Sequence, residues 1–298
     1  MHTQSKGLGV TRHALGFLLA SLLILPPFSR GDPADSAALA RMVEVSSAYE
    51  SFPDFKMDYK VIFHDEDGDV TTKRQFTRLG NRWRVNVWDA AGELRRIVSY
   101  DGTTFYDLLV PADKLSIATS LERLSASVAF EVTTVPLIFP YHAFFQSPGS
   151  RLDPRALFSK LEWAEKLRSF KFAEFGKDQS AGCSFTAQMN SQDIAVTYSD
   201  GAYMPSQVVL GNKSFGADRK RLIKILGTKM HRVSGVNISV PDQLMTADPV
   251  SGLSQQRDVT IDFIGISELN KGVSPDSFVI PKTAAKYFKD RDVHPYVK

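Results

Sequence analysis

The residues that most resemble a chemical motif are three aspartates at alternate positions, Asp65, Asp67 and Asp69. Alternate carboxylates begin the loop of an EF-hand, which binds Ca²⁺ through oxygen ligands. Here the glycine falls at the fourth position rather than the sixth, and the twelfth position is Phe76 rather than glutamate. We therefore interpret the stretch as a solvated hairpin tip and predict no metal site.

Other reactive side chains also lack the spacing that chemistry requires. The sequence contains no nucleophile elbow, no His-Glu-x-x-His, no phosphate loop and no dinucleotide fingerprint. The only cysteine, Cys183, lies in an alternating segment that predicts a buried, inert thiol in a strand. The sequence thus predicts no catalytic residues, no cofactor and no enzyme, while a site assembled from distant residues stays open. Four histidines show no metal-ligand spacing: His64, His142, His231 and His294.

The first 31 residues predict a secretory signal peptide. Lys6 and Arg12 precede the apolar run 17–25, and small residues at Ser29 and Gly31 suit cleavage before Asp32. The run is too short for a membrane-spanning helix, which needs about 20 apolar residues. No cysteine follows it for lipid attachment. We expect a soluble periplasmic or secreted protein, with residues 32–298 forming one domain and at most peripheral membrane contact.

Charge argues against a nucleic-acid partner. The leader holds three of the 36 basic residues and none of the 33 acidic ones, so the remainder carries no net charge. Without a global basic field, nucleic-acid binding is not expected. The local basic cluster 218–224 is interpreted as a solvated loop or strand edge, with contact to an anionic headgroup as the alternative.

Strict alternation predicts that strand 55–63 has one apolar face, directed inward. The alternate positions between these apolar residues are mostly charged, beginning with Lys56, Asp58 and Lys60. Segment 82–87 alternates in the same way. The inward residues of the two segments are Phe55, Met57, Tyr59, Val61, Phe63, Trp83, Val85 and Val87.

The stretch 99–109, Ser-Tyr-Asp-Gly-Thr-Thr-Phe-Tyr-Asp-Leu-Leu, predicts a hairpin. Asp101-Gly102 is typical of a two-residue type I′ turn, and aromatic residues favour the strand that follows. Alternation predicts that Phe105 shares a face with Trp83, while Tyr106 lies on the other face or at the rim.

The remaining pattern predicts the fold class. A helix is expected over 35–49, a helical insert at about 119–168, and strands on both sides of the insert. About eleven strands make a mainly β (α+β) protein, with a curved antiparallel sheet or incomplete β-barrel and a helical lid. Residues 241–256 are expected to form a loop and 273–281 an extended tail. The strands are expected near 55–63, 70–78, 82–87, 94–100, 105–109, 169–175, 182–189, 193–199, 203–211, 220–233 and 257–266.

The segment 135–145 is unusually apolar and is interrupted by Pro136 and Pro140. Two interpretations stay open. Either it fills the sheet as permanent core, or it covers a hydrophobic cavity, a site that β-barrels commonly provide for ligands. On the second interpretation, Leu137 and Phe139 join the residues that line the cavity.

Three short motifs resemble the LolA-like superfamily of periplasmic lipoprotein carriers. Segment 78–84 resembles its arginine–proline–aromatic–arginine stretch, with Leu79 in place of proline. Segment 100–106 resembles its aspartate–glycine hairpin, and 278–281 its closing phenylalanine–x–x–proline. The resemblance extends over most of 36–290 and is greatest to a branch of uncharacterised predicted periplasmic proteins.

The resemblance implies an incomplete barrel whose apolar concave face holds acyl chains under a helical lid. It also implies that a buried arginine latches the lid, and Arg78 occupies the matching position. The expected function is therefore a non-enzymatic carrier of a lipid or lipoprotein acyl chain. An envelope-stress sensor or scaffold that contacts an envelope protein is the alternative, and a secreted hydrolase is the third.

Overall fold

The computed structural model describes most of the strand-forming residues on either side of the predicted helical insert. By its internal contacts the chain divides into Met1–Asp32 and Pro33–Lys298, and all described residues lie in the second unit. The division does not test the predicted cleavage, which stays a prediction. The described residues are 40, 43, 44, 47, 54–65, 67–124, 126–137, 164, 171–178, 182–189, 192–198, 205–212, 220–233, 236–247, 258–267 and 272–293.

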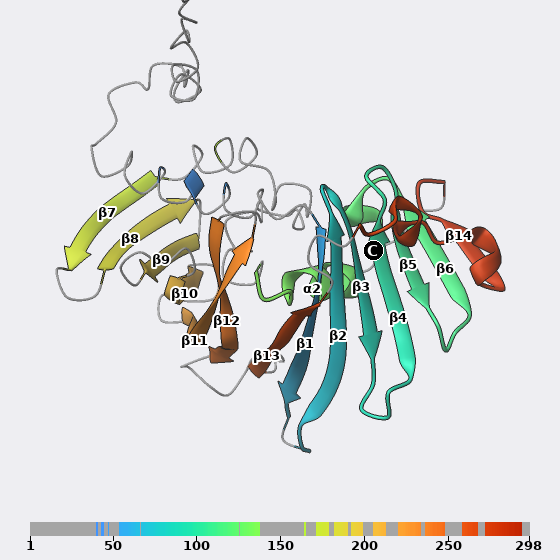
Figure 1. Ribbon diagram of the computed structural model, residues 1–298, viewed down its shortest axis with the longest axis horizontal. Coiled ribbons are helices and arrows are strands. Elements are labelled where there is room, and N and C mark those ends of the chain that lie inside the picture. The colour runs from blue at the N-terminus through green and yellow to red at the C-terminus, as the bar shows by residue number, and fades with distance from the viewer. Residues whose placement is uncertain are drawn as a thin grey trace, which may run out of the picture. The chain divides into compact units, whose positions relative to one another are not determined.

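These residues are mostly β, and the fourteen strands form one sheet (Figure 1). Its order is β14-β6-β5-β4-β3-β2-β1-β13-β12-β11-β10-β9-β8-β7, so β14 and β7 are the edges and the sheet is not closed. Neighbours with a described register are antiparallel except β14 and β6, which are parallel. The strands are β1 Asp54–His64, β2 Val70–Leu79, β3 Arg82–Trp88, β4 Leu94–Tyr100, β5 Phe105–Leu109, β6 Lys114–Ala118, β7 Lys171–Asp178, β8 Gly182–Met189, β9 Gln192–Tyr198, β10 Pro205–Asn212, β11 Lys220–Val233, β12 Val236–Ala247, β13 Asp258–Ser267 and β14 Tyr287–Asp290.

The predicted fold class is confirmed, and three strands are added to the eleven expected. These are β6, β12 and β14. The expected loop over 241–256 was wrong as far as Ala247, because β12 continues through Pro241 and pairs with both β11 and β13. A proline normally argues against a central strand, since it cannot donate to the ladder.

Short helices interrupt the strands. The 3-10 helix η1 covers Leu121–Arg123 and the helix α2 covers Ala126–Thr133, both inside the expected insert. Ala164 is helical too, while the rest of the insert lies outside the described residues. In the expected first helix, Ala40, Val43, Glu44 and Ser47 are helical. No helix among the residues that the structure describes is long and apolar enough to span a membrane.

The hairpin between β4 and β5 differs from the predicted turn. Four residues, 101–104, connect the strands, and Gly102 is the one with positive φ, at 103°. The Asp101 carboxylate accepts hydrogen bonds from the N–H groups of Thr103 and Thr104, each at 2.8 Å. A side chain that binds its own turn in this way replaces the type I′ geometry.

The same carboxylate is linked to Tyr106, whose hydroxyl donates to Asp101 Oδ2 at 2.7 Å. Partial burial alone would raise the pKa of Asp101, but the hydrogen bonds from Thr104, Tyr106 and Thr103 outweigh it and hold the pKa below its ordinary value. Burial and the bond to Asp101 raise the pKa of Tyr106 to about 12. Both shifts favour the pair in which Asp101 is ionised and Tyr106 is protonated.

We therefore expect Tyr106→Phe to cost about 1 kcal/mol of unfolding free energy near pH 7, with a defined pH dependence. Asp101 has a lowered pKa, so its contribution is present above about pH 4 and is lost as the pH falls through its folded pKa. Tyr106 has a raised pKa, so its contribution is complete below about pH 10 and is lost toward pH 12. The difference between wild type and variant in urea unfolding should shrink at both extremes. A constant difference from pH 2 to pH 12 would contradict the pairing.

The C-terminal segment covers the other side of this hairpin. Ile280 packs in a cluster with Ile97, Tyr106, Leu108 and Leu115. The Ser99 hydroxyl donates to the Phe278 carbonyl at 2.7 Å. The expected extended tail was wrong over Pro275–Phe278, which forms a 3-10 helix with Ser274 at its N-cap.

Candidate functional site

The candidate site is the face of β1–β5 that packs against α2, called the inner face below. Cross-strand pairing joins Met57 to Phe76, Phe76 to Val85 and Val85 to Val98, so these side chains share one face. Further along the ladder, Trp83 is paired with Tyr100 and Tyr100 with Phe105. The buried apolar members of the inner face are Phe55, Met57, Tyr59, Val61, Phe76, Trp83, Val85, Val87, Val98, Tyr100 and Phe105.

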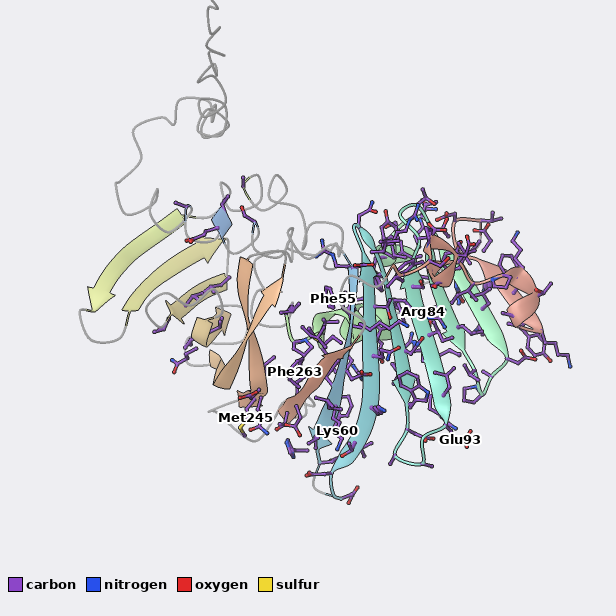
Figure 2. All side chains as sticks on the ribbon, in the orientation of Figure 1. Phe55, Lys60, Arg84, Glu93, Met245 and Phe263 are labelled. Carbon is purple, nitrogen blue, oxygen red and sulfur yellow. The ribbon has the colours of Figure 1, made fainter. Side chains whose placement is uncertain are left out.

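The predicted inward register of β1 is confirmed. Phe55, Met57, Tyr59 and Val61 are fully buried, whereas Lys60 is exposed. Figure 2 shows Phe55 and Lys60 at separate points along β1. Phe63 is half-buried and its ring centroid lies 5.5 Å from that of Phe130 in α2. The side chains expected to line a cavity are therefore placed on one face, although their ligand role stays a prediction.

One end of the inner face is aromatic. The rings of Tyr100 and Phe105 are stacked with centroids 4.3 Å apart, and Trp83 lies 6.1 Å from Phe105. Trp83 is fully buried, yet its Nε1 has no hydrogen-bond partner among the residues that the structure describes. An indole N–H only donates, and leaving it buried without an acceptor is unfavourable. The aromatic end therefore holds one unused donor in an apolar setting.

Four charged side chains lie between the sheet and α2 and form a buried cluster, called the ion network below. Arg74 of β2 places Nη1 2.7 Å from Glu131 Oε2 of α2 and also donates to the Thr134 hydroxyl. Arg96 of β4 pairs with both oxygens of Asp107 in β5, at 2.7 and 3.0 Å. Arg96 Nη1 lies 3.8 Å from Glu131 Oε1 and so joins the two pairs.

The ion network is neutral and nearly excluded from water. Its two arginines and two carboxylates have side chains 2–10% exposed. Arg74 also lies over the Phe63 and Phe130 rings, at 5.9 and 5.5 Å from their centroids. Removing one partner from such a cluster leaves a buried charge, which costs more than the pair itself contributes. The network therefore fixes where α2 meets the sheet.

Tyr59 borders the ion network. Its hydroxyl lies near Arg74, Glu131 and Thr134 but forms no well-aligned hydrogen bond with a described residue. Burial raises the pKa of Tyr59 well above its ordinary value, and the nearby Arg74 offsets only part of this effect. Tyr59 is therefore a neutral hydroxyl at the polar border of an otherwise apolar face.

Arg78, the residue expected to latch the lid, is buried on the inner face opposite Phe55 and Trp83. Its Nε donates to the Gly80 carbonyl in the β2–β3 turn at 2.8 Å. The shortest described ion pair between the sheet and α2 is made by Arg74, two inward positions earlier on the strand. The latch role of Arg78 stays a prediction.

We expect Arg78→Leu to lower the unfolding free energy by about 1–3 kcal/mol, because the hydrogen bond from the buried guanidinium to the Gly80 carbonyl is lost. Arg82→Leu, at the start of the next strand, is the control and should change it by no more than about 0.5 kcal/mol. Thermal melts and urea unfolding measure both. A loss within about 0.5 kcal/mol for Arg78→Leu would mean that the guanidinium contributes nothing to the fold.

The other predicted site residues have separate outcomes. Phe105 shares the face of Trp83, Val85 and Val87, and Tyr106 lies on the opposite face, as predicted. Leu137, just after α2, is buried. Phe139 lies outside the described residues, as does most of the segment 135–145, so the choice between permanent core and cavity cover stays open.

Sequence reasoning missed the ion network, although a signal was present. In β2 the inward positions are Val70, Thr72, Arg74, Phe76 and Arg78. Two arginines therefore occupy positions that point toward the apolar face. A charge at a buried position requires a partner. The sequence gives no indication that the partner would be Glu131, because this depends on how α2 crosses the sheet.

Among the described residues, no group of three or more histidine, cysteine, aspartate or glutamate side chains is placed to hold a metal ion. His64 Nδ1 instead pairs with Asp69 at 2.9 Å, and its Nε2 contacts the Thr260 hydroxyl at 2.7 Å. The arrangement brings together apolar side chains and one neutral ion network, which suits binding of an apolar group better than acid–base chemistry.

Comparison with known proteins places the fold. No protein-family model and no curated protein sequence matches the chain. A DUF1329 family protein from Desulfovibrio piger superposes with a TM-score of 0.52 and 9% identity, over 86% of this chain and 100% of that one. Likeness at this identity shows the fold alone.

Two further solved structures are similar at lower scores. A putative outer membrane lipoprotein-sorting protein domain from Vibrio parahaemolyticus has a TM-score of 0.47 and 9% identity, over 80% of this chain and 97% of that one. A LolA superfamily protein from Nitrosomonas europaea has 0.47 and 8%, over the same shares of 80% and 97%. The solved structures similar to this chain thus include a DUF1329 family protein and, at lower scores, proteins described as LolA superfamily or lipoprotein-sorting.

Proposed function

We propose that the protein is a non-enzymatic carrier that holds an acyl chain of a lipid or lipoprotein against the inner face. The observation that carries the proposal is the position of the ion network, between an apolar sheet face and the helix α2. An apolar face of eleven buried side chains offers a surface for a hydrocarbon. Each methylene transferred from water contributes about 0.8 kcal/mol.

Access to this face requires a movement. Its residues from Phe55 to Phe105 are almost completely buried, so a ligand reaches them only when what covers them is displaced. Val128 and Val132 of α2 are buried as well. Separation of α2 from β2 and β4 would expose the apolar face and hydrate the ion network at the same time. Water solvates the separated charged groups of the ion network well. Such an opening therefore costs less free energy than the separation of an equally large apolar contact.

Two polar atoms on the inner face, one at its aromatic end and one beside the ion network, suit the head of an acyl ligand. The Trp83 Nε1 donor and the Tyr59 hydroxyl lie on the same apolar face and have no well-aligned partner among the described residues. The carbonyl oxygen of an ester or amide accepts such donors, whereas a plain hydrocarbon does not. This supports an acyl ester or acyl amide over a free alkane.

The proposal includes the cellular address. A cleaved leader of 31 residues would place residues 32–298 in the periplasm or outside the cell, where acylated molecules cross an aqueous space. Any membrane contact would then be peripheral, and nucleic acid is not a proposed partner.

A scaffold or envelope sensor on the same fold is the second candidate. The near-complete burial of the inner face favours it, because a permanently filled sheet would leave only outer surfaces for an envelope protein. The two candidates differ in whether the inner face ever holds a ligand. A secreted hydrolase has no comparable support, since the described residues group no catalytic set at this face.

Native mass spectrometry of the protein purified from its own cell envelope tests the proposal. We expect a fraction of the molecules to carry an additional mass that fragments as an acylated lipid or lipopeptide. Organic extraction should remove this mass, and re-addition of the extract should restore it. A bare mass, together with no uptake of added long-chain acyl lipid, would contradict the carrier and favour the scaffold.

A further inference from the structure

The C-terminal edge of the sheet exposes aromatic rings beside lysines. Tyr287 and Phe288 of β14 are 57% and 38% exposed, and Val279 is 46% exposed. The Phe288 ring lies 4.7 Å from Lys282 Nζ, and the Tyr287 ring lies 5.4 Å from Lys286 Nζ. We define the edge patch as Val279, Lys282, Lys286, Tyr287, Phe288 and Lys289.

The edge patch is held in place by backbone hydrogen bonds. β14 pairs in parallel with β6, and the N–H of Tyr287 donates to the Asp113 carbonyl at 2.9 Å. The N–H of Arg291 donates to the Ile117 carbonyl at 2.8 Å. Ile280 anchors the preceding residues in the buried cluster. The rings are therefore held at the surface, because the strand that carries them is fixed at both ends.

The charge around the rings is positive. Residues 279–289 hold three lysines and no acidic residue. The carboxylates next to the patch are used by the chain: Asp113 accepts from the Lys286 N–H at 2.9 Å, Asp290 at the end of β14 accepts from the Asp292 N–H at 3.0 Å, and Asp292 pairs with Arg123 at 2.9 Å. Among the described residues, Lys282, Lys286 and Lys289 have no carboxylate partner. Their ammonium groups remain available to an anionic surface.

We propose that the edge patch docks the protein on an anionic phospholipid surface. Neighbouring residues of a strand point to opposite faces, so Tyr287 and Phe288 place one ring on each side of the edge. This suits shallow, edge-on insertion at headgroup depth, where aromatic rings and lysines are favoured together. Addition of a partner strand is the less suitable use of this edge, because it has four residues and carries lysines, both of which discourage pairing.

The inference goes beyond the proposed function, since docking on a bilayer requires no ligand on the inner face. Each can hold while the other fails. Together they would give a carrier that meets the membrane surface with one edge while its apolar face stays closed.

Vesicle flotation tests the edge patch. The purified protein is mixed with vesicles of equal parts phosphatidylglycerol and phosphatidylcholine, or of phosphatidylcholine alone. We expect binding to the anionic vesicles that weakens as salt is raised. Lys282→Gln/Lys286→Gln/Lys289→Gln should lower the partition coefficient about 100-fold, at about fivefold per lysine. Tyr287→Ser/Phe288→Ser should lower it about tenfold.

Three controls keep the test decisive. Met245→Ser/Ile264→Ser removes two exposed apolar residues elsewhere on the sheet, at 38% and 48% exposure, and should bind as wild type. Replacing the three lysines by arginine keeps the charge and should also bind as wild type. All variants are prepared with the same first residue as the wild-type protein. Each should keep the wild-type midpoint of thermal unfolding. The proposal would be overturned by equal binding to neutral vesicles, by no binding to either kind, or by an equal loss in the Met245/Ile264 variant. Absence of vesicle binding would leave strand addition as the use of this edge.

Discussion

Arg74→Leu is expected to lower the free energy of unfolding by about 3–5 kcal/mol, the range for breaking a buried charge pair. The substitution leaves Glu131 buried with Arg96 as its remaining cation, at 3.8 Å instead of the 2.7 Å of the lost partner. It also removes the donor to Thr134 and the cation above the Phe63 and Phe130 rings. Urea unfolding at neutral pH, followed by circular dichroism, measures the loss.

The control is Arg95→Leu, on the same sheet but 53% exposed and 3.7 Å from Asp89. An exposed pair of this kind contributes little, so the change should stay within about 0.5 kcal/mol. The double variant Arg74→Leu/Glu131→Leu should recover part of the loss, because it leaves no unpaired charge at this contact. Equal costs for Arg74→Leu and Arg95→Leu would mean that the ion network does not hold α2.

Phe105→Ala is expected to cost about 3–5 kcal/mol, as for other fully buried phenylalanines. The ring is 1% exposed and stacks on Tyr100 beside Trp83, so its removal leaves a cavity at the aromatic end of the inner face. The cavity should also shift the fluorescence of Trp83, which loses a neighbouring ring. Urea unfolding and emission spectra test both effects.

Phe288→Ala is the matched control, because it removes the same ring from an exposed position of β14. Its cost should stay within about 0.5 kcal/mol. A small cost for Phe105→Ala, close to that of Phe288→Ala, would show that the aromatic end of the inner face is loosely packed. It would then argue for an already open cavity in place of one that opens with α2.

The sequence was sufficient to predict the sheet and its faces, because alternation is a local property. The register of β1 and the opposite faces of Phe105 and Tyr106 follow from it once the strands are recognised. The β4–β5 turn was predicted in the right place but with the wrong geometry, because the Asp101 carboxylate competes for the turn N–H groups. The same local signals place β7 to β11 within a few residues of their observed bounds.

The missed features depend on contacts between distant segments. β14 pairs with β6, 173 positions earlier at Tyr287 and Lys114, and a four-residue parallel strand has no pattern of its own. β12 was missed because a proline such as Pro241 normally argues against a central strand. Arg78 was predicted as the latch because it matched a family motif, whereas the structure joins sheet and helix through Arg74 and Glu131. Which inward arginine meets a helix is decided by packing geometry, which neither composition nor spacing contains.

Photocrosslinking with an acyl chain tests the central claim most directly. The protein is loaded with a palmitoyl lipid that carries a diazirine in mid-chain, irradiated, digested and mapped by mass spectrometry. The carrier account predicts labels on inner-face residues of β1 and β3, such as Met57, Val61 and Val85, with competition by unlabelled lipid. Arg74→Leu, which loosens α2, should change the labelling yield but not its positions. Labels confined to the outer surface, or no label that unlabelled lipid displaces, would contradict the claim that the inner face holds an acyl chain.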